Sequence, residues 1–117
     1  MYQVIKRDGK ITDFDLNKVS VAITKAFEAQ NKQYVPAIID MLTLRVTADF
    51  ENKIENNLVH VEDIQDSVEH VLEQSGYTDV AKAYILYRKQ REKIRNMKST
   101  ILDYKEVVNN YVHLEDW

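Results

Sequence analysis

The chain has 117 residues, enough for one compact domain, of which 44% are apolar and 30% charged, with a net charge of −3. This balance argues against a protein that binds nucleic acid over its whole surface, and the absence of cysteine excludes disulfides, thiolate-bound zinc, iron–sulfur clusters and cysteine nucleophiles. Two widely separated glycines exclude a Walker A loop and a dinucleotide-binding fingerprint. No apolar run is long enough for a membrane span or a signal-peptide core, so we expect a cytoplasmic domain.

The first predicted element is a β-hairpin centred on Asp8-Gly9. Residues 2–7 and 10–12 are short β-capable runs, and Asp-Gly between two such runs favours a two-residue type I′ turn in which both central residues have positive φ. A strand that continues to this turn would hold Lys6 and Arg7 rigidly on opposite faces.

Two helices are expected to follow the hairpin. Asp15 is the predicted N-cap of the first, and Pro36 suits the first turn of the second, where its missing N–H costs nothing. Apolar side chains recur every three or four residues along the first helix at Leu16, Val19, Ile23, Ala26 and Phe27. Those of the second are Ile39, Leu42, Val46, Phe50 and Ile54, and Asn56-Asn57 end it.

After a short extended piece at residues 58–60, two further helices are predicted. The third closes at Gly76, the expected left-handed cap, and carries Val61, Ile64, Val68, Val71 and Leu72. The inner stripe of the fourth is Val80, Ala83, Tyr84, Tyr87, Ile94 and Met97. The expected fold class is therefore α+β and mostly helical, a four-helix bundle capped by an N-terminal hairpin that a third strand could extend. This domain spans residues 1–98, and residues 99–117 form a linker or docking segment.

Charge is unevenly distributed along the chain. The net charge is +2 over residues 1–32, −8 over 33–81, +6 over 82–98 and −3 over 99–117. If the two basic segments meet in space, they form a local anion-binding site on an acidic body. The alternative is that the later basic run is a solvated helix face.

The cations near the hairpin are candidate phosphate ligands. Lys6 and Arg7 flank the turn, and Lys18 lies one turn into the first helix, near its positive dipole end, where an anion is favoured. An apolar slot for a base is offered by Val4, Phe14 and Val19. Alternatively, these cations only keep the edge of the hairpin soluble.

The fourth helix carries a second group of cations. Arg88, Arg91 and Arg95 follow one another at steps of three and four beside Tyr84 and Tyr87. Arginine pairs with phosphate in a bidentate manner, and a tyrosine ring can stack on a base or a ribose. The same residues could contact nucleic acid, or form a salt-bridged helix face.

An acidic stripe marks the third helix, where it could be a solvated face, a Mg²⁺ site or a surface for a basic partner. Its members are Glu62, Asp66, Glu69 and Glu73. The three histidines lack metal-ligand spacing, and no serine or carboxylate pair has a catalytic context, so catalysis within this chain is not expected.

Several stretches together resemble an ATP-cone domain, over roughly residues 3–95. They are Val4-Ile5-Lys6-Arg7-Asp8-Gly9, Phe14-Asp15-Leu16-Asn17-Lys18-Val19, Val61-Glu62-Asp63-Ile64-Gln65 and Ala81 through Tyr84-Ile85-Leu86-Tyr87-Arg88. ATP-cones are adenine-nucleotide sensors at the amino terminus of ribonucleotide reductases and in a repressor of their genes. The resemblance implies a four-helix bundle capped by a short sheet that binds ATP or dATP with Mg²⁺.

The resemblance also suggests a set of site residues. The expected phosphate ligands are Lys6, Arg7, Lys18, Arg88 and Arg91. The expected adenine and ribose pocket is made of Val4, Phe14, Asp15, Val19, Val61, Gln65 and Tyr87. We expect no catalytic residue and no side chain that binds metal by itself. The number of nucleotides per cone, one or two, is left open.

By resemblance, the function is allosteric: ATP permits and dATP inhibits the overall activity of a ribonucleotide reductase, through conformational or oligomeric change. Residues 101–111 and Glu115-Asp116-Trp117 resemble the linker into the catalytic domain of anaerobic (class III) ribonucleoside-triphosphate reductases. We therefore expect a non-catalytic regulatory fragment of such an enzyme. Its partners would be ATP or dATP, the catalytic domain of the same parent chain and another copy in a homo-oligomer.

Three alternatives stay open. The repressor of reductase genes has a cysteine zinc ribbon before its cone, which this sequence lacks. A DNA-binding module would use the basic face of residues 88–95 and show steep salt dependence. A protein-interaction adaptor would use the acidic stripe and ignore nucleotides.

Overall fold

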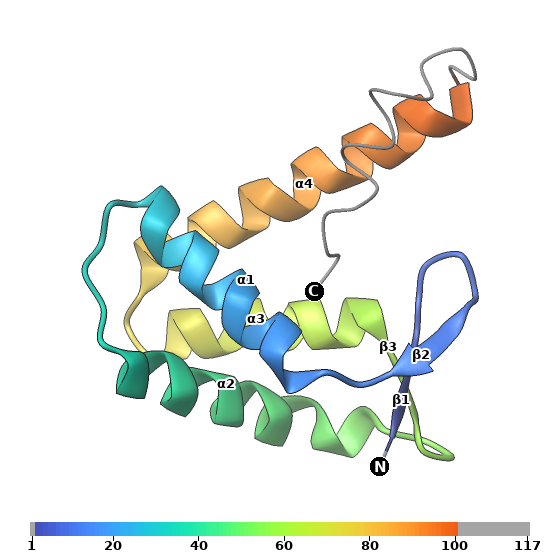
Figure 1. Ribbon diagram of the computed structural model, residues 1–117, viewed down its shortest axis with the longest axis horizontal. Helices are drawn as coiled ribbons and strands as arrows, with labels where there is room; N and C mark the ends of the chain where they lie inside the picture. Colours follow the sequence, from blue (N-terminus) through green and yellow to red (C-terminus); the bar gives the residue numbers. More distant parts are fainter. Residues whose placement is uncertain (1, 101–117) are drawn as a thin grey trace.

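Four α-helices and one small sheet make up residues 2–100, the part of the chain that the computed structural model describes (Figure 1). This confirms the expected α+β, mostly helical fold class. The elements are β1 (Gln3–Ile5), β2 (Ile11–Asp13), α1 (Leu16–Ala29), α2 (Pro36–Phe50), the 3₁₀ turn η1 (Glu51–Lys53), β3 (Leu58–His60), α3 (Val61–Gln74) and α4 (Thr78–Thr100).

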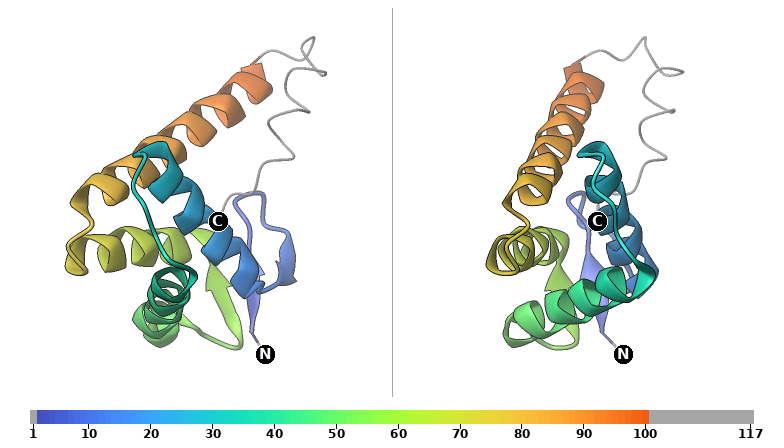
Figure 2. Two further views of the ribbon diagram at one scale, coloured as in Figure 1. Left: turned by 60° about the vertical axis from the view of Figure 1, so that its left-hand side comes forward. Right: turned by 90° about the vertical axis from the view of Figure 1, so that its left-hand side faces the viewer.

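The sheet has three strands in the order β2-β1-β3. β1 pairs antiparallel with β2 and parallel with β3, so that Val4 lies between Thr12 and Val59. The third strand left open by the sequence is therefore present at residues 58–60. The sheet lies at one end of the helices (Figures 1 and 2), and the buried side chains of Val4 and Val59 join the helical core.

The hairpin turn differs from the predicted type I′ geometry. Gly9 has φ +87°, but Asp8 does not have positive φ. The Gly9 N–H donates to the Lys6 carbonyl at 2.9 Å, and the Lys6 N–H donates to the Lys10 carbonyl at 2.8 Å. This is a three-residue connection closed by a left-handed glycine, which Asp-Gly suits equally well. β1 therefore ends at Ile5, and Arg7 lies in the turn rather than on a strand face.

The type I′ pattern occurs instead at Asn56-Asn57, ahead of β3. These residues have φ of 54° and 62°, and the backbones of Glu55 and Leu58 exchange two hydrogen bonds of 2.9 Å. The sequence assigned Asn56-Asn57 to the end of the second helix. That was wrong, because α2 ends at Phe50 and the chain is already extended at Ile54.

Several helix signals are confirmed. The Asn17 N–H donates to Asp15 Oδ1 at 2.9 Å, so Asp15 is the N-cap of α1, and Pro36 is the first residue of α2. α3 closes with Gly76 at φ +89°. The Gly76 N–H donates to the Glu73 carbonyl and the Tyr77 N–H to the Leu72 carbonyl, which together form a Schellman motif.

The core lies where the helices and the sheet meet. α1 packs against α2 and α4, and α3 packs against the same two helices. The largest fully buried side chains are Tyr84, Phe27, Phe50, Ile23, Leu42, Ile64 and Leu72. Among residues 2–100, no helix has both the length and the apolar character needed to cross a bilayer.

Two residues predicted to lie on inner stripes are exposed. Leu16, in the first turn of α1, is 40% exposed, and Met97 of α4 is 47% exposed. Met97 belongs to the second half of α4, which extends past the other helices (Figures 1 and 2). The apolar periodicity predicted the buried face of each helix correctly, but it could not show how much of that face the neighbouring helices cover.

Replacing Gly76 by alanine should lower the free energy of unfolding by about 1 kcal/mol, because an L-residue is strained at this φ. A Cβ at Gly76 would meet no atom within 4 Å, so the loss reports backbone strain alone. Gly76→Asn should cost less, since asparagine tolerates the left-handed region. Urea denaturation measures both variants, and an alanine variant as stable as the wild type would contradict this account of the cap.

Candidate functional site

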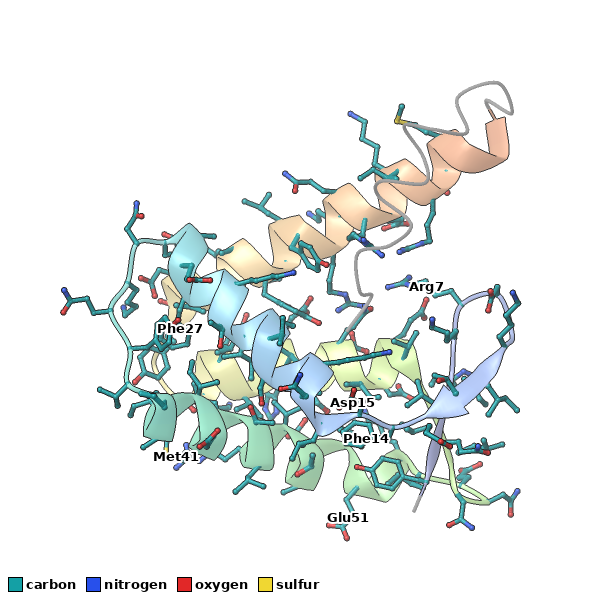
Figure 3. The ribbon with its side chains drawn as sticks, viewed as in Figure 1. Arg7, Phe14, Asp15, Phe27, Met41 and Glu51 are labelled. Atoms are coloured by element: carbon teal, nitrogen blue, oxygen red, sulfur yellow. The ribbon has the colours of Figure 1, made fainter. Side chains whose placement is uncertain are left out.

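One face of α3 gathers the charged side chains of the site. Glu62, Gln65, Asp66 and Glu69 recur at steps of three and four, which places them along one side of the helix. Arg7 approaches this face from the hairpin turn (Figure 3). Its Nη1 donates to Glu62 Oε1 at 3.0 Å, and its Nη2 donates to Gln65 Oε1.

Arg88 of α4 approaches the same face. Its Nη1 donates to Glu69 Oε1 at 2.7 Å and to Asp66 Oδ1 at 3.0 Å. The partners of the two arginines lie between positions 62 and 69, which is about 10 Å along a helix axis. The amino-terminal turn and the last helix therefore bring their guanidinium groups together over α3, as the charge distribution suggested they could.

These contacts change the interpretation of the acidic stripe. Glu62 and Asp66 are 60% and 56% exposed, as a solvated face requires, but they and the more buried Glu69 also pair with arginine. Burial by itself would lower the pKa of Arg88, but its hydrogen bonds to Glu69 and Asp66 outweigh burial and raise the pKa above the usual value. Arg88 is therefore a permanent cation with its own carboxylate counter-ions.

Arg91 and Tyr87 continue the site along α4. Arg91 is only 8% exposed, and its Cζ lies 6.0 Å from the centre of the Tyr87 ring, within range of a cation–π contact. A solvated helix face is therefore wrong for Arg91, whereas Arg88 forms the salt-bridged face that was the alternative for this stripe. The Tyr87 ring lies 6.4 Å from that of Tyr84, one helical turn earlier.

A cavity of about 250 Å³ opens beside Arg7, between the hairpin turn and the first residues of α3. Lys6 and Val61 line it together with Arg7, Glu62, Ile5, Gly9 and His60. The amino terminus of a helix favours a bound anion, and here that terminus adjoins two cationic residues. The predicted residues Lys6, Arg7, Val61, Gln65 and Arg88 thus lie in one region.

The other predicted pocket residues lie deeper or are engaged locally. Val4 and Val19 are fully buried in the core, and the Phe14 ring packs against Tyr2 and Phe50 at 4.8 and 5.7 Å between ring centres. Asp15 caps α1 (Figure 3), and Lys18 is half-buried in the first turn of that helix. Contact of these residues with a nucleotide stays a prediction.

A second cavity, of about 290 Å³, lies between α1 and α4, and sequence reasoning missed it. Its lining is mostly apolar and consists of Ala22, Lys25, Ala26, Ala29, Gln30, Ala83, Tyr84, Leu86, Tyr87 and Gln90. Small alanines on the facing sides of two helices were the available signal, since they leave room where larger residues would close the groove.

The structure also reveals two atoms at the arginine site that the sequence could not single out. Arg7 Nε and the Tyr84 hydroxyl are buried, and neither has a hydrogen-bond partner among the described residues. Burial raises the pKa of the Tyr84 hydroxyl well above its usual value, so the group keeps its proton. Tyr84 was predicted as a core residue and is one, being 1% exposed, but its polar end lies among charges.

Comparisons with known proteins bear on this geometry. The family model described as ATP cone domain matches residues 2–93. The alpha subunit of ribonucleoside-diphosphate reductase from Chlamydia pneumoniae is 42% identical over 101 residues, which cover 81% of this chain and 10% of that protein. The vitamin B12-dependent ribonucleoside-diphosphate reductase of Thermoplasma acidophilum is 41% identical over 102 residues, which cover 82% of this chain and 13% of that protein.

The anaerobic ribonucleoside-triphosphate reductase of Haemophilus influenzae is 33% identical over 103 residues, covering 86% of this chain and 14% of that protein. The matched region is thus a small part of each of these relatives, between 10% and 14% of their length. Because the family model spans most of the sequence, from the hairpin into α4, this chain belongs to the ATP-cone family.

Proposed function

We propose that this domain binds the triphosphate of ATP or dATP between the hairpin turn, α3 and α4, and so regulates a ribonucleotide reductase. The observation that carries the proposal is the meeting of Arg7 and Arg88 on one face of α3. Guanidinium groups bind phosphate oxygens in bidentate fashion, and two of them whose partners on α3 are offset by about one helical turn suit a polyphosphate better than a single phosphate. That the bound base is adenine is inferred from membership of the ATP-cone family.

Mg²⁺ would arrive with the nucleotide. Within residues 2–100 there is no group of three or more acidic or histidine side chains placed to hold a metal, and Glu62, Asp66 and Glu69 are engaged by arginines. Mg²⁺ commonly binds substrate phosphates and water together with only one or two carboxylates. The domain would therefore hold the ion mainly through the nucleotide.

Binding of phosphate requires an exchange of partners. Arg7 and Arg88 already pair with carboxylates of α3, so an incoming phosphate competes with Glu62 for the first and with Asp66 and Glu69 for the second. This exchange alters the links from α3 to the hairpin and to α4 at once. A nucleotide can shift the state of the domain only through such differential contacts.

ATP and dATP differ by one ribose hydroxyl. A hydrogen bond that this hydroxyl makes or lacks would contribute about 1–3 kcal/mol, enough to favour one conformation or assembly by tenfold or more. We propose that ATP permits and dATP inhibits activity, with another copy of the cone as one partner in the inhibited assembly. The signal would pass to the catalytic domain of the parent chain, this domain itself being non-catalytic.

For the parent enzyme we propose an anaerobic ribonucleoside-triphosphate reductase, on the resemblance at residues 101–117, which lie outside the described residues. The relatives span diphosphate and triphosphate reductases, and the two diphosphate reductases above share more identity with this chain. The full-length chain, assayed without oxygen on ribonucleoside di- and triphosphates, tests the proposal. Turnover of diphosphates alone would contradict it.

The rival functions gain less from the geometry. A DNA-binding face on α4 would need exposed arginines, whereas Arg88 is paired and Arg91 is buried. An adaptor that used the acidic stripe would first have to release Glu62, Asp66 and Glu69 from arginine. A nucleotide phosphate, by contrast, would bind the arginines themselves and take the place of the carboxylates that now pair with them.

Replacing Arg7 by glutamine should weaken ATP binding about tenfold to a hundredfold, because charge-assisted hydrogen bonds to phosphate are lost. Isothermal titration calorimetry measures the change. Lys89→Gln removes one positive charge from an exposed position next to Arg88 and should leave the affinity within about twofold. Equal losses in the two variants would show a general charge effect and contradict the site.

Replacing Glu62 by glutamine should strengthen ATP binding several-fold, because it removes the carboxylate that competes for Arg7. Glu73→Gln is the matched control, since it removes the same charge from an exposed position farther along α3. Titrations of both variants at low and at physiological salt would compare them. If Glu62→Gln binds no tighter than Glu73→Gln, the exchange of partners is wrong.

A further inference from the structure

The two unpartnered atoms of the arginine site are the starting point. Arg7 Nε and the Tyr84 hydroxyl are both buried, and the whole Tyr84 side chain is 1% exposed. Buried polar groups in folded proteins nearly always have a hydrogen-bond partner, because leaving one unpaired is costly. Two unpaired donors in one region indicate that their hydrogen-bond acceptor is supplied by a bound ligand.

The chemistry of these atoms defines what is missing. Arginine Nε is only a donor, and the raised pKa of Tyr84 keeps its hydroxyl protonated and able to donate. The acceptors nearby are already engaged, since Gln65 and Glu62 accept from Arg7, and Glu69 and Asp66 accept from Arg88. Neither of the two buried donors, Arg7 Nε and the Tyr84 hydroxyl, has an acceptor among the described residues.

The surrounding charges favour an anionic acceptor. Arg88 follows Tyr84 by four residues, so the two side chains are neighbours on the same face of α4. The positive charges of Arg88 and Arg7 and the negative charge of Glu69 all act on the Tyr84 hydroxyl, and a phosphate that displaces Glu69 from Arg88 would take its place. An oxygen that enters between these groups meets two cations, which suits a phosphate oxygen better than a neutral hydroxyl of the ribose.

We propose that the Tyr84 hydroxyl, together with Arg7 Nε, donates a hydrogen bond to a phosphate oxygen of the bound nucleotide. Tyr84 is then a phosphate ligand on α4, in addition to the residues that the family resemblance suggests. The inference rests on the proposed function, because it assigns a contact within the same site. It also gives the hydroxyl a role that a core tyrosine would not need.

Tyr84→Phe removes the hydroxyl and keeps the ring in the core. The ligand-free variant should melt at the same temperature as the wild type or higher, because an unpartnered buried hydroxyl is lost. Its affinity for ATP should fall about tenfold, and its affinity for inorganic tripolyphosphate, measured by competition with ATP, should fall by the same factor. Tyr34→Phe, in the exposed segment between α1 and α2, is the control and should change neither affinity.

Each outcome decides the matter. Wild-type and Tyr84→Phe proteins with equal affinity for ATP would overturn the inference and leave the proposed function intact. A loss for ATP without a loss for tripolyphosphate would place the hydroxyl on the nucleoside and overturn the phosphate assignment, as would tripolyphosphate that fails to compete. A lower melting temperature of the ligand-free variant would show that the hydroxyl already has a partner such as a buried water. A wild type that binds no ATP would instead defeat the proposed function.

Discussion

The pairing of two partly buried arginines with one face of α3 is the constraint on which the rest of this molecule depends. Arginine does not lose its proton in proteins, so Arg7 and Arg88 need a counter-anion in every state of the domain. In the structure that anion is supplied by Glu62, Asp66 and Glu69. A phosphate that replaces them as partner would keep each arginine paired with an anion while changing which segments are linked, and this makes the site suitable for a switch.

The position of α3 makes such a change consequential. The helix begins directly after β3, packs against α2 and α4, and is linked to the hairpin through Arg7 and to α4 through Arg88. An exchange of anions would therefore act on the hairpin and on α4 together. In our proposal α4 carries the result outward, because its second half already extends beyond the other helices (Figure 1). The carboxylates set how tightly a ligand must bind the arginines, since it has to displace them.

Local signals predicted most of the fold because they depend on neighbouring residues. Asp15, Pro36 and Gly76 ended or began helices as expected, each for a reason contained in its own side chain or lack of one. The prediction of a type I′ hairpin turn was wrong because Asp-Gly occurs in both two- and three-residue connections. Spacing placed the acidic stripe on one face of α3 but could not show which segments pack there. The role that we propose for Tyr84 could not be predicted, because its ring fits an apolar stripe and only the structure shows that its hydroxyl is buried without a partner among the described residues.

The most direct test of the central claim is an NMR measurement of the guanidinium groups themselves. Each arginine side chain gives a ¹⁵Nε–¹Hε signal, and single substitutions assign those of Arg7 and Arg88. We predict that saturating ATP shifts both signals and slows the exchange of the Arg7 Hε with water, because the same polyphosphate contacts both groups and gives Arg7 Nε a partner. Binding of ATP that leaves either signal where it was would show that the two arginines do not share one ligand, and would contradict the account.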